Sequence, residues 1–151
     1  MLVSHWIPAN LNDVLPRSPH SGASPEQLRF LREVRDTLLE LHAALLQVER
    51  QAYERSSLPP TPFELLRLLT ESPQFAWLRP VSILVAEIDD LMDAVPASSA
   101  VSIADVTRRV ASLVRLEVAP EDFKARYRDA LQESVEVAGL HADLRRLLAG
   151  R

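Results

Sequence analysis

The longest periodic stretch of the chain starts near residue 24 and predicts a long amphipathic helix. Ser24 can cap the helix, Pro25 suits its first position, and Gln27 can complete a capping box. The apolar side chains that follow recur at alternating steps of three and four, the pattern of a helix-packing seam. They are Leu31, Val34, Leu38, Leu41, Leu45, Val48 and Ala52.

The same helix carries a second apolar line at Leu39, Leu46 and Tyr53. This line lies about 100° around the helix from the first, so the apolar face is wide enough for two neighbours, as a bundle requires. Residues 58–60, Leu-Pro-Pro, end the helix because proline lacks an amide donor.

Proline-marked start signals organise the middle of the chain. Residues 61–64, Thr-Pro-Phe-Glu, form a second capping box that opens a short helix. Residues 72–75, Ser-Pro-Gln-Phe, repeat the start signal and predict a single helical turn. Pro80 disfavours helix at the residue before it, so we expect a kink there and a new helix over residues 80–95.

Two more helices complete the predicted fold. Residues 102–105, Ser-Ile-Ala-Asp, form a capping pattern, and Pro120 starts the last helix, which we expect to run to about residue 148. Short connections predict that consecutive helices are antiparallel neighbours. The sequence therefore predicts an all-α fold, an antiparallel up-and-down bundle of four main helices plus one short helix, in a single domain over residues 24–151.

Residues 1–23 have no sustained period, because Pro8, Pro16 and Pro19 interrupt them. The segment still carries several large apolar side chains, including Trp6, which are costly to leave in water. We expect an extended N-terminal arm that packs on the bundle; docking on a partner is the alternative.

Composition narrows the function. The chain has no cysteine, which excludes disulfides and thiolate chemistry, and its three glycines are too scattered to build a phosphate-binding loop. The net charge of −4 argues against nucleic-acid binding. The first residues lack the basic and apolar regions of a signal peptide, so we expect none, and no apolar run of about 20 residues occurs. We expect a soluble cytoplasmic protein with no cofactor and no nucleic-acid or membrane partner.

One motif has a familiar counterpart. Residues 72–82, SPQFAWLRPVS, resemble a family of small uncharacterised bacterial helical proteins with a Pro-x-Phe-Ala-Trp-Leu-x-Pro-Leu-Ser core. The Leu-x-x-Leu-His-x-x-Leu-Leu pattern of residues 38–46 and Tyr53 also fit, and the similarity spans about residues 28–148. Val81 stands where the family pattern has leucine. The family has no assigned activity, so the resemblance implies a bacterial origin and no mechanism.

Two histidines on long helices are candidate metal ligands. In an antiparallel bundle His42 and His141 could meet and bind a metal with Glu49, or with Glu87. Di-iron bundles normally carry Glu-x-x-His, which this chain lacks. The alternative is that both histidines are boundary residues with hydrogen-bond partners.

Heptad spacing relates three polar residues of the first helix, Arg35, His42 and Glu49. Such a line is typical of half-exposed helix edges, whose long stems cover apolar surface, and we expect that role here. The alternative is a buried polar seam that fixes helix register or lines a ligand pocket.

An acidic cluster marks the helix predicted over residues 80–95. General acid–base catalysis needs carboxyl groups in different environments, whereas these side chains mostly point outward. We expect a solvated face; contact with an arginine-rich partner, or with the chain's own Arg108 and Arg109, is an alternative. The cluster comprises Glu87, Asp89, Asp90 and Asp93.

Phe75, Trp77 and Arg79 beside Pro80 form the sharpest local feature. We expect the two aromatic rings to plug one end of the bundle. The alternative is a partner-binding hot spot, to which Trp6 of the arm is a further candidate.

No nucleophile motif of a known hydrolase occurs, so no catalytic residue is predicted. The first helix has more apolar face than one neighbour requires. We therefore expect a non-enzymatic helical interaction module that binds a protein partner or itself, for example as a homodimer. The alternative is a small-ligand or metal-binding helical bundle.

Overall fold

The computed structural model describes residues 22–94 and 100–150, which form seven α-helices and no β-strand. The all-α class is confirmed, but the predicted count of four main helices and one short helix is wrong. Most of the predicted arm, including Trp6, lies outside the described residues. The helices are α1 (Pro25–Ser56), α2 (Pro62–Glu71), α3 (Pro73–Ala76), α4 (Arg79–Asp93), α5 (Ala100–Val114), α6 (Glu121–Glu133) and α7 (Val135–Ala149).

The predicted capping boxes start α1 and α2. The backbone amide of Gln27 donates to Ser24 Oγ at 3.1 Å, and the backbone amide of Ser24 donates to the side-chain oxygen of Gln27, Oε1, at 2.8 Å. Thr61 and Glu64 repeat this reciprocal pair at the start of α2. The kink before Pro80 is also confirmed, because α3 ends at Ala76 and α4 begins at Arg79.

Two helix boundaries differ from the prediction. The expected continuous last helix breaks at Ser134, whose backbone is extended (φ −123°, ψ 116°) and whose Oγ accepts from the Val137 amide at 3.2 Å. No proline or glycine marks this break, so the apolar pattern ran through it. Ser102 is not a cap, because α5 already begins at Ala100.

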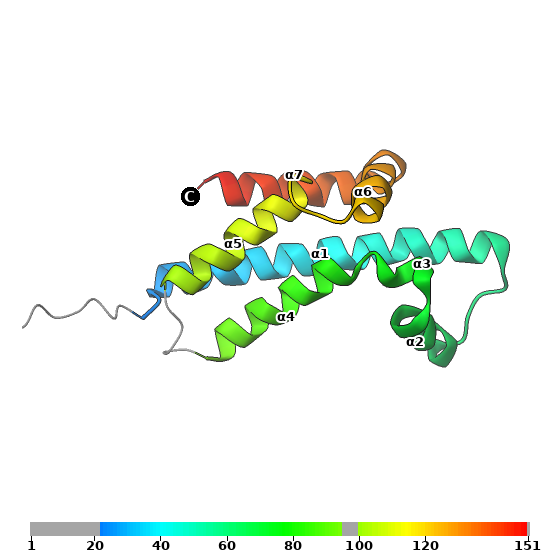
Figure 1. Ribbon diagram of the computed structural model, residues 1–151, viewed down its shortest axis with the longest axis horizontal. Helices are drawn as coiled ribbons and strands as arrows, with labels where there is room; N and C mark the ends of the chain where they lie inside the picture. Colours follow the sequence, from blue (N-terminus) through cyan, green and yellow to red (C-terminus); the bar gives the residue numbers. More distant parts are fainter. Residues whose placement is uncertain (1–21, 95–99, 151) are drawn as a thin grey trace, which may run out of the picture.

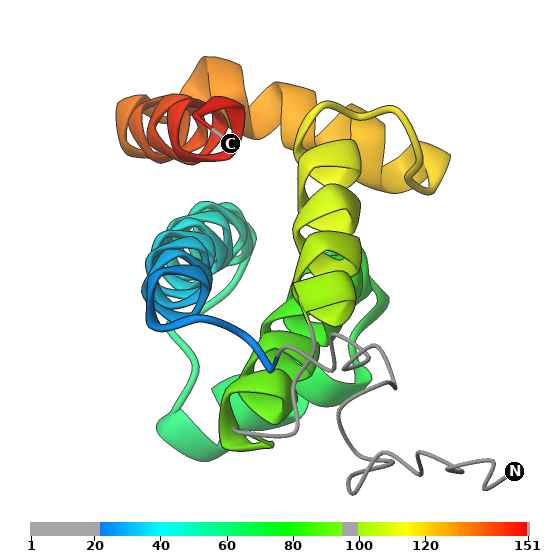
Figure 2. The same ribbon diagram turned by 90° about the vertical axis from the view of Figure 1, so that its left-hand side faces the viewer.

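Helix α1 runs the length of the described fold, and three other helices pack around it (Figure 1). Helices α4 and α7 lie alongside it on two sides and run antiparallel to it (Figure 1). Helix α5 crosses between α4 and α7 on the side away from α1 (Figure 2). These four helices therefore surround the core, while α2, α3 and α6 gather at the C-terminal end of α1 (Figure 1).

The predicted α1 seam forms the centre of the core. Leu31, Val34, Leu38 and Leu45 are fully buried. The second apolar line is wrong for Leu39, which is 40% exposed, whereas Leu46 is half-buried and packs against the core. The apolar face also extends in the opposite direction around the helix, where Phe30 and Ala44 are buried. The apolar face of α1 is thus used inside the fold and does not supply the leftover stripe expected from the sequence.

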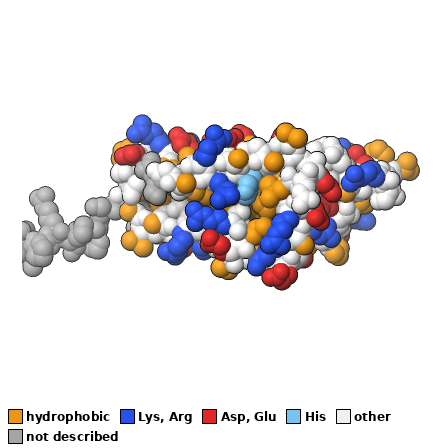
Figure 3. Space-filling view, turned by 90° about the horizontal axis from the view of Figure 1, so that it is seen from above, with side chains coloured by type: hydrophobic (Ala, Val, Ile, Leu, Met, Phe, Trp, Pro, Cys, Tyr) orange, Lys and Arg blue, Asp and Glu red, His pale blue; other side chains and the backbone are white. Residues whose placement is uncertain are grey.

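The surface on the α7 side carries basic and acidic side chains interspersed, with apolar side chains between them (Figure 3). Among the described residues no helix combines the length and apolar character needed to cross a membrane.

Candidate functional site

The heptad line of α1 is a set of interhelical polar contacts. Arg35 Nε donates to Asp89 Oδ1 of α4 at 2.8 Å, and His42 Nε2 lies 2.9 Å from Ser82 Oγ of α4. Glu49 follows one heptad later and is only 8% exposed. The half-exposed edge expected for this line is therefore wrong for Glu49.

The spacing of these contacts shows how α1 and α4 are registered. A step of seven from Arg35 to His42 along α1 is matched by a step of seven backward from Asp89 to Ser82 along α4. Antiparallel helices in constant register produce this pattern, because each heptad returns to the same face. We call Arg35, His42 and Glu49 with their partners the polar seam.

Glu49 is the most heavily bonded side chain of the seam. Its carboxylate accepts from Trp77 Nε1 at 3.0 Å, from Gln74 Nε2 at 3.2 Å and from Arg126 Nη1 at 3.3 Å. Helices α1, α3 and α6 are thereby joined at one carboxylate, which lies in a polar groove of about 620 Å³. Burying a charge is costly unless it is paired and hydrogen-bonded, and both conditions hold here.

An aromatic ladder continues from this carboxylate into the α6–α7 contact. Trp77 packs on Phe123 with ring centroids 5.6 Å apart, Phe123 stacks on Tyr127 at 5.3 Å, and Tyr127 meets His141 at 5.6 Å. Tyr127 Oη and His141 Nδ1 are hydrogen-bonded at 2.8 Å. Burial raises the pKa of Tyr127, so the group that His141 contacts in this ladder is a neutral hydroxyl.

His42 and His141 are both half-buried and both have a hydrogen-bond partner, which confirms the boundary-residue alternative. Burial lowers the pKa of His42; burial, and then the charge of Arg145, lower the pKa of His141. Within residues 22–94 and 100–150, no group of three or more histidine or acidic side chains is placed to hold a metal ion. The structure therefore does not bring His42, Glu49 and His141 together as ligands.

The aromatic pair predicted to plug the bundle is buried. Phe75 and Trp77 are each 3% exposed, so neither ring is open to a partner, whereas Arg79 is exposed. The predicted plug is thus confirmed for the two rings. Trp6, the remaining partner candidate, lies outside the described residues.

The acidic face of α4 is partly used within the fold. Glu87 forms an ion pair with Arg109 of α5, with Oε2 and Nη2 2.5 Å apart. Asp89 belongs to the polar seam, while Asp90 and Asp93 are exposed. The predicted solvated face is therefore wrong for Glu87 and for Asp89, which pairs with Arg35. The alternative contact with the arginines of α5 is confirmed at Arg109.

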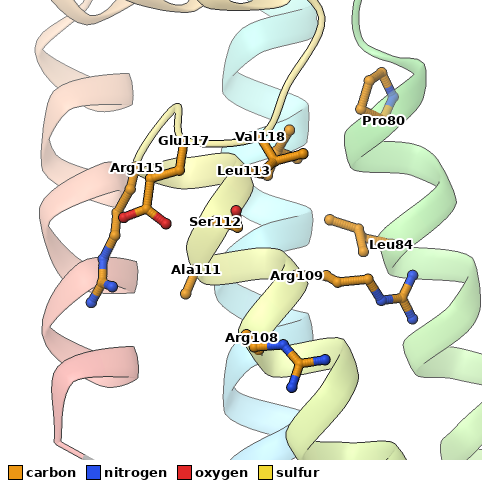
Figure 4. A pocket seen from close by; sticks show the side chains of 10 residues that line it. All are labelled: Pro80, Leu84, Arg108, Arg109, Ala111, Ser112, Leu113, Arg115, Glu117 and Val118. Atoms are coloured by element: carbon orange, nitrogen blue, oxygen red, sulfur yellow. The ribbon is translucent and has the colours of Figure 1, made fainter.

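A groove of about 500 Å³ separates α4 from α5 (Figure 4). Pro80, Leu84 and Val118 give it apolar walls, and in the close-up the arginines on its rim point in different directions (Figure 4). Arg109 is paired with Glu87 and Asp105. Since these cations do not converge, the groove has no marked preference for an anion.

A second groove, of about 350 Å³, is lined by residues of α1, α2, α4 and the segment around α3, and it includes His42 and Ser82 of the polar seam. Its polar members are His42, Ser82, Arg79 and Thr70. Its apolar members are Leu46, Leu69, Phe75, Ala76 and Leu78. Cavities near this size with apolar walls and a few polar groups are typical of small-molecule sites. We call it the α2 groove.

Helix α2 itself is the least embedded helix among those with eight or more residues. None of its side chains is buried. Phe63 and Leu66 are 73% and 60% exposed, whereas Leu65, Leu68 and Leu69 are half-buried on the inner side. Phe63 and Leu66, three residues apart on this helix, form the α2 outer face.

Sequence reasoning missed several of these residues. Ser82 and Asp89 carry a heptad signal that matches the α1 line, but nothing in the sequence pairs the two lines. Gln74 and Arg126 gave no signal. Phe63 and Leu66 could have been found, because leucines around residues 65–69 already fill the inner side of that helix.

Comparisons with known proteins add no relative. No protein-family model matches the chain, and neither a curated protein nor a solved structure shows significant similarity to it. The resemblance suggested by residues 72–82 therefore stays a prediction.

Proposed function

We propose that the protein is a non-enzymatic helical interaction module that self-associates through the α2 outer face. The observation that carries the proposal is the exposure of Phe63 and Leu66 on a helix that buries no side chain. An amphipathic helix of a monomer normally turns one apolar stripe inward and a polar side outward. Helix α2 has apolar side chains on both sides, which favours a helix whose inner side packs on its own fold and whose outer side is covered by a partner.

A second copy of the chain fits this surface. One flank of the α2 outer face carries Glu64, Arg67 and Glu71, the last two within 3.9 Å of each other. When two identical helices pair antiparallel about a twofold axis, the same flank of each copy meets the other. Arg67 can then face an acidic side chain of the partner copy twice, once on each side of the axis.

The expected association is weak. Stable interfaces bury about 800 Å² per partner, which the outer face of one ten-residue helix does not supply alone. We therefore expect a dimer that dissociates in the micromolar range, at roughly 8 kcal/mol or less of binding free energy.

Sedimentation velocity over a wide concentration range tests the proposal. The double variant Phe63→Ser, Leu66→Ser should remain monomeric where the wild type dimerises. A matched control, Val101→Ser with Val135→Ser, removes two apolar side chains that are 79% and 91% exposed on other helices and should dimerise like the wild type. A wild-type chain that stays monomeric at about 200 μM, well above the expected dissociation constant, would overturn the proposal.

A further inference from the structure

We propose that the α2 groove binds a small carboxylic acid with an apolar tail, with Arg79 and Ser82 at the carboxylate and His42 hydrogen-bonded to Ser82. The groove lies against the inner side of α2, opposite the α2 outer face, so this inference does not depend on self-association. It rests on the volume of about 350 Å³ and on the way apolar and polar side chains divide its walls.

The apolar walls define the tail of the ligand. Leu46 comes from α1, Leu69 from α2, and Phe75 and Leu78 from the segment around α3, so three sides of the groove are hydrocarbon. Phe75 and Leu78 are 3% and 2% exposed and belong to the packed core, which makes that side of the groove firm. A cavity at the lower end of the usual size range for ligand sites favours a short chain or a single ring.

The polar side defines the head group. Arg79 is exposed, and its side chain has no ion-pair or hydrogen-bond partner among the described residues. A guanidinium group offers several N–H donors in a planar arrangement that matches a carboxylate. Arg79 can therefore turn toward the groove without breaking a contact within the described fold.

His42 and Ser82 supply a second donor beside Arg79. Their side chains are 2.9 Å apart, and among the described residues no carboxylate bonds to the other ring nitrogen of His42. A neutral imidazole that donates from Nε2 to Ser82 Oγ leaves the hydroxyl proton of Ser82 available. Within the described part of the chain, the other acceptor near that hydroxyl is the Leu78 carbonyl oxygen, 3.5 Å away, so the proton can be donated to a ligand oxygen instead.

The local fold favours a negative charge at this place. Ser82 and Arg79 both belong to the first turn of α4, a 15-residue helix whose N-cap, Leu78, provides no side-chain hydrogen bond. The macrodipole of a helix stabilises an anion near its N-terminus. This effect adds to the two side-chain donors and does not replace them.

Access is provided by α2. Leu69 and Thr70 form one wall of the groove, and the helix that carries them buries no side chain. Segments with few buried apolar contacts open at low free-energy cost. A ligand can thus enter by a small displacement of α2 while the walls from α1, α3 and α4 stay in place.

Octanoate and its neutral analogue octanamide are the probes, titrated by calorimetry into the full-length protein. Octanoate should bind saturably, and octanamide about tenfold or more weakly because the charge-assisted hydrogen bonds are lost. The Arg79→Gln variant should bind octanoate more weakly by a similar factor, and its affinity for octanamide should equal that of the wild type. Arg115→Gln, an exposed arginine outside the groove, is the matched control and should bind like the wild type.

The monomeric Phe63→Ser, Leu66→Ser variant should bind octanoate as the wild type does, which separates this inference from the self-association proposal. Amide chemical shifts should change at Ser82 and Leu46 on addition of octanoate. Three results would each overturn the inference: equal affinity for octanoate and octanamide, equal loss of octanoate affinity in Arg79→Gln and Arg115→Gln, or no saturable binding of octanoate up to about 10 mM.

Discussion

Replacing Glu49 tests which contact of the polar seam stabilises the fold. Its carboxylate accepts from the buried indole N–H of Trp77 and from Arg126, whose side chain is 44% exposed. In Glu49→Ala the indole N–H loses its partner in a buried position, which costs about 1–3 kcal/mol. The ion pair with Arg126 is screened by solvent and adds only about 0.5–1 kcal/mol. We expect a total loss of about 3 kcal/mol in the free energy of unfolding.

The conservative variant Glu49→Gln separates the two contributions. The glutamine side-chain oxygen can still accept from Trp77 Nε1, while the charge that attracts Arg126 is gone. The expected loss is therefore about 1 kcal/mol, well below that of the alanine variant.

Urea unfolding followed by far-UV circular dichroism measures both losses, and double-mutant cycles assign them. The coupling free energy between Glu49 and Trp77, measured with Trp77→Phe, should exceed the coupling between Glu49 and Arg126, measured with Arg126→Gln. The reasoning is refuted if the Arg126 coupling is the larger, or if Glu49→Ala changes stability by less than about 0.5 kcal/mol.

Three other predictions concern single features. Burial lowers the pKa of His42 and of His141, so on acidification the histidines of the unfolded chain bind protons before those of the folded chain. The free energy of unfolding should therefore keep its full value above pH 6.5, the ordinary histidine pKa, and decrease as the pH drops below it. The urea midpoint of the His42→Gln, His141→Gln variant should decrease less over the same pH range than that of the wild type. Ser134→Ala should cost about 1 kcal/mol in urea unfolding because the Val137 amide loses its cap, whereas Ser134→Gly should cost only a few tenths; equal losses would contradict the capping role. In a Trp6→Phe background, Trp77 emission should be blue-shifted and poorly quenched by acrylamide, since its ring is 3% exposed; a red-shifted spectrum would contradict the burial.

The sequence predicted the starts of α1 and α2 correctly, but it did not predict the helix break at Ser134. Ser24 and Thr61 each combine a capping hydroxyl, a following proline and a reciprocal Gln or Glu, so three local preferences agree. Ser134 has only the hydroxyl, and Val137 in the third helical position cannot complete a box. Apolar periodicity is continuous through that point, so only packing between α6 and α7 decides that the chain turns there.

The candidate sites also contain both residues that the sequence predicted and residues that it did not. The apolar walls around Phe75 and Leu78 follow from residues that the sequence marks as core, and the burial of Trp77 was expected. The role of Ser82 was invisible, because a lone serine in a helix has no pattern of its own until the facing helix is known. The exposed outer side of α2 was overlooked although the sequence carries a signal for it: leucines already fill the inner side of that helix, so Phe63 is left facing water.

The kink at Pro80 gives the polar seam its buried end. If α4 continued as one straight helix toward its N-terminus, the heptad step from Asp89 to Ser82 would next reach position 75, opposite Glu49. Pro80 prevents that continuation, and the turn of α3 lets Phe75 enter the core while the indole N–H of Trp77 approaches the carboxylate at 3.0 Å. A phenylalanine opposite Glu49 could not donate a hydrogen bond, so the charge would be buried at a cost of several kcal/mol. The kink thus places a hydrogen-bond donor, and not an apolar ring, beside Glu49, the buried residue of the three on α1.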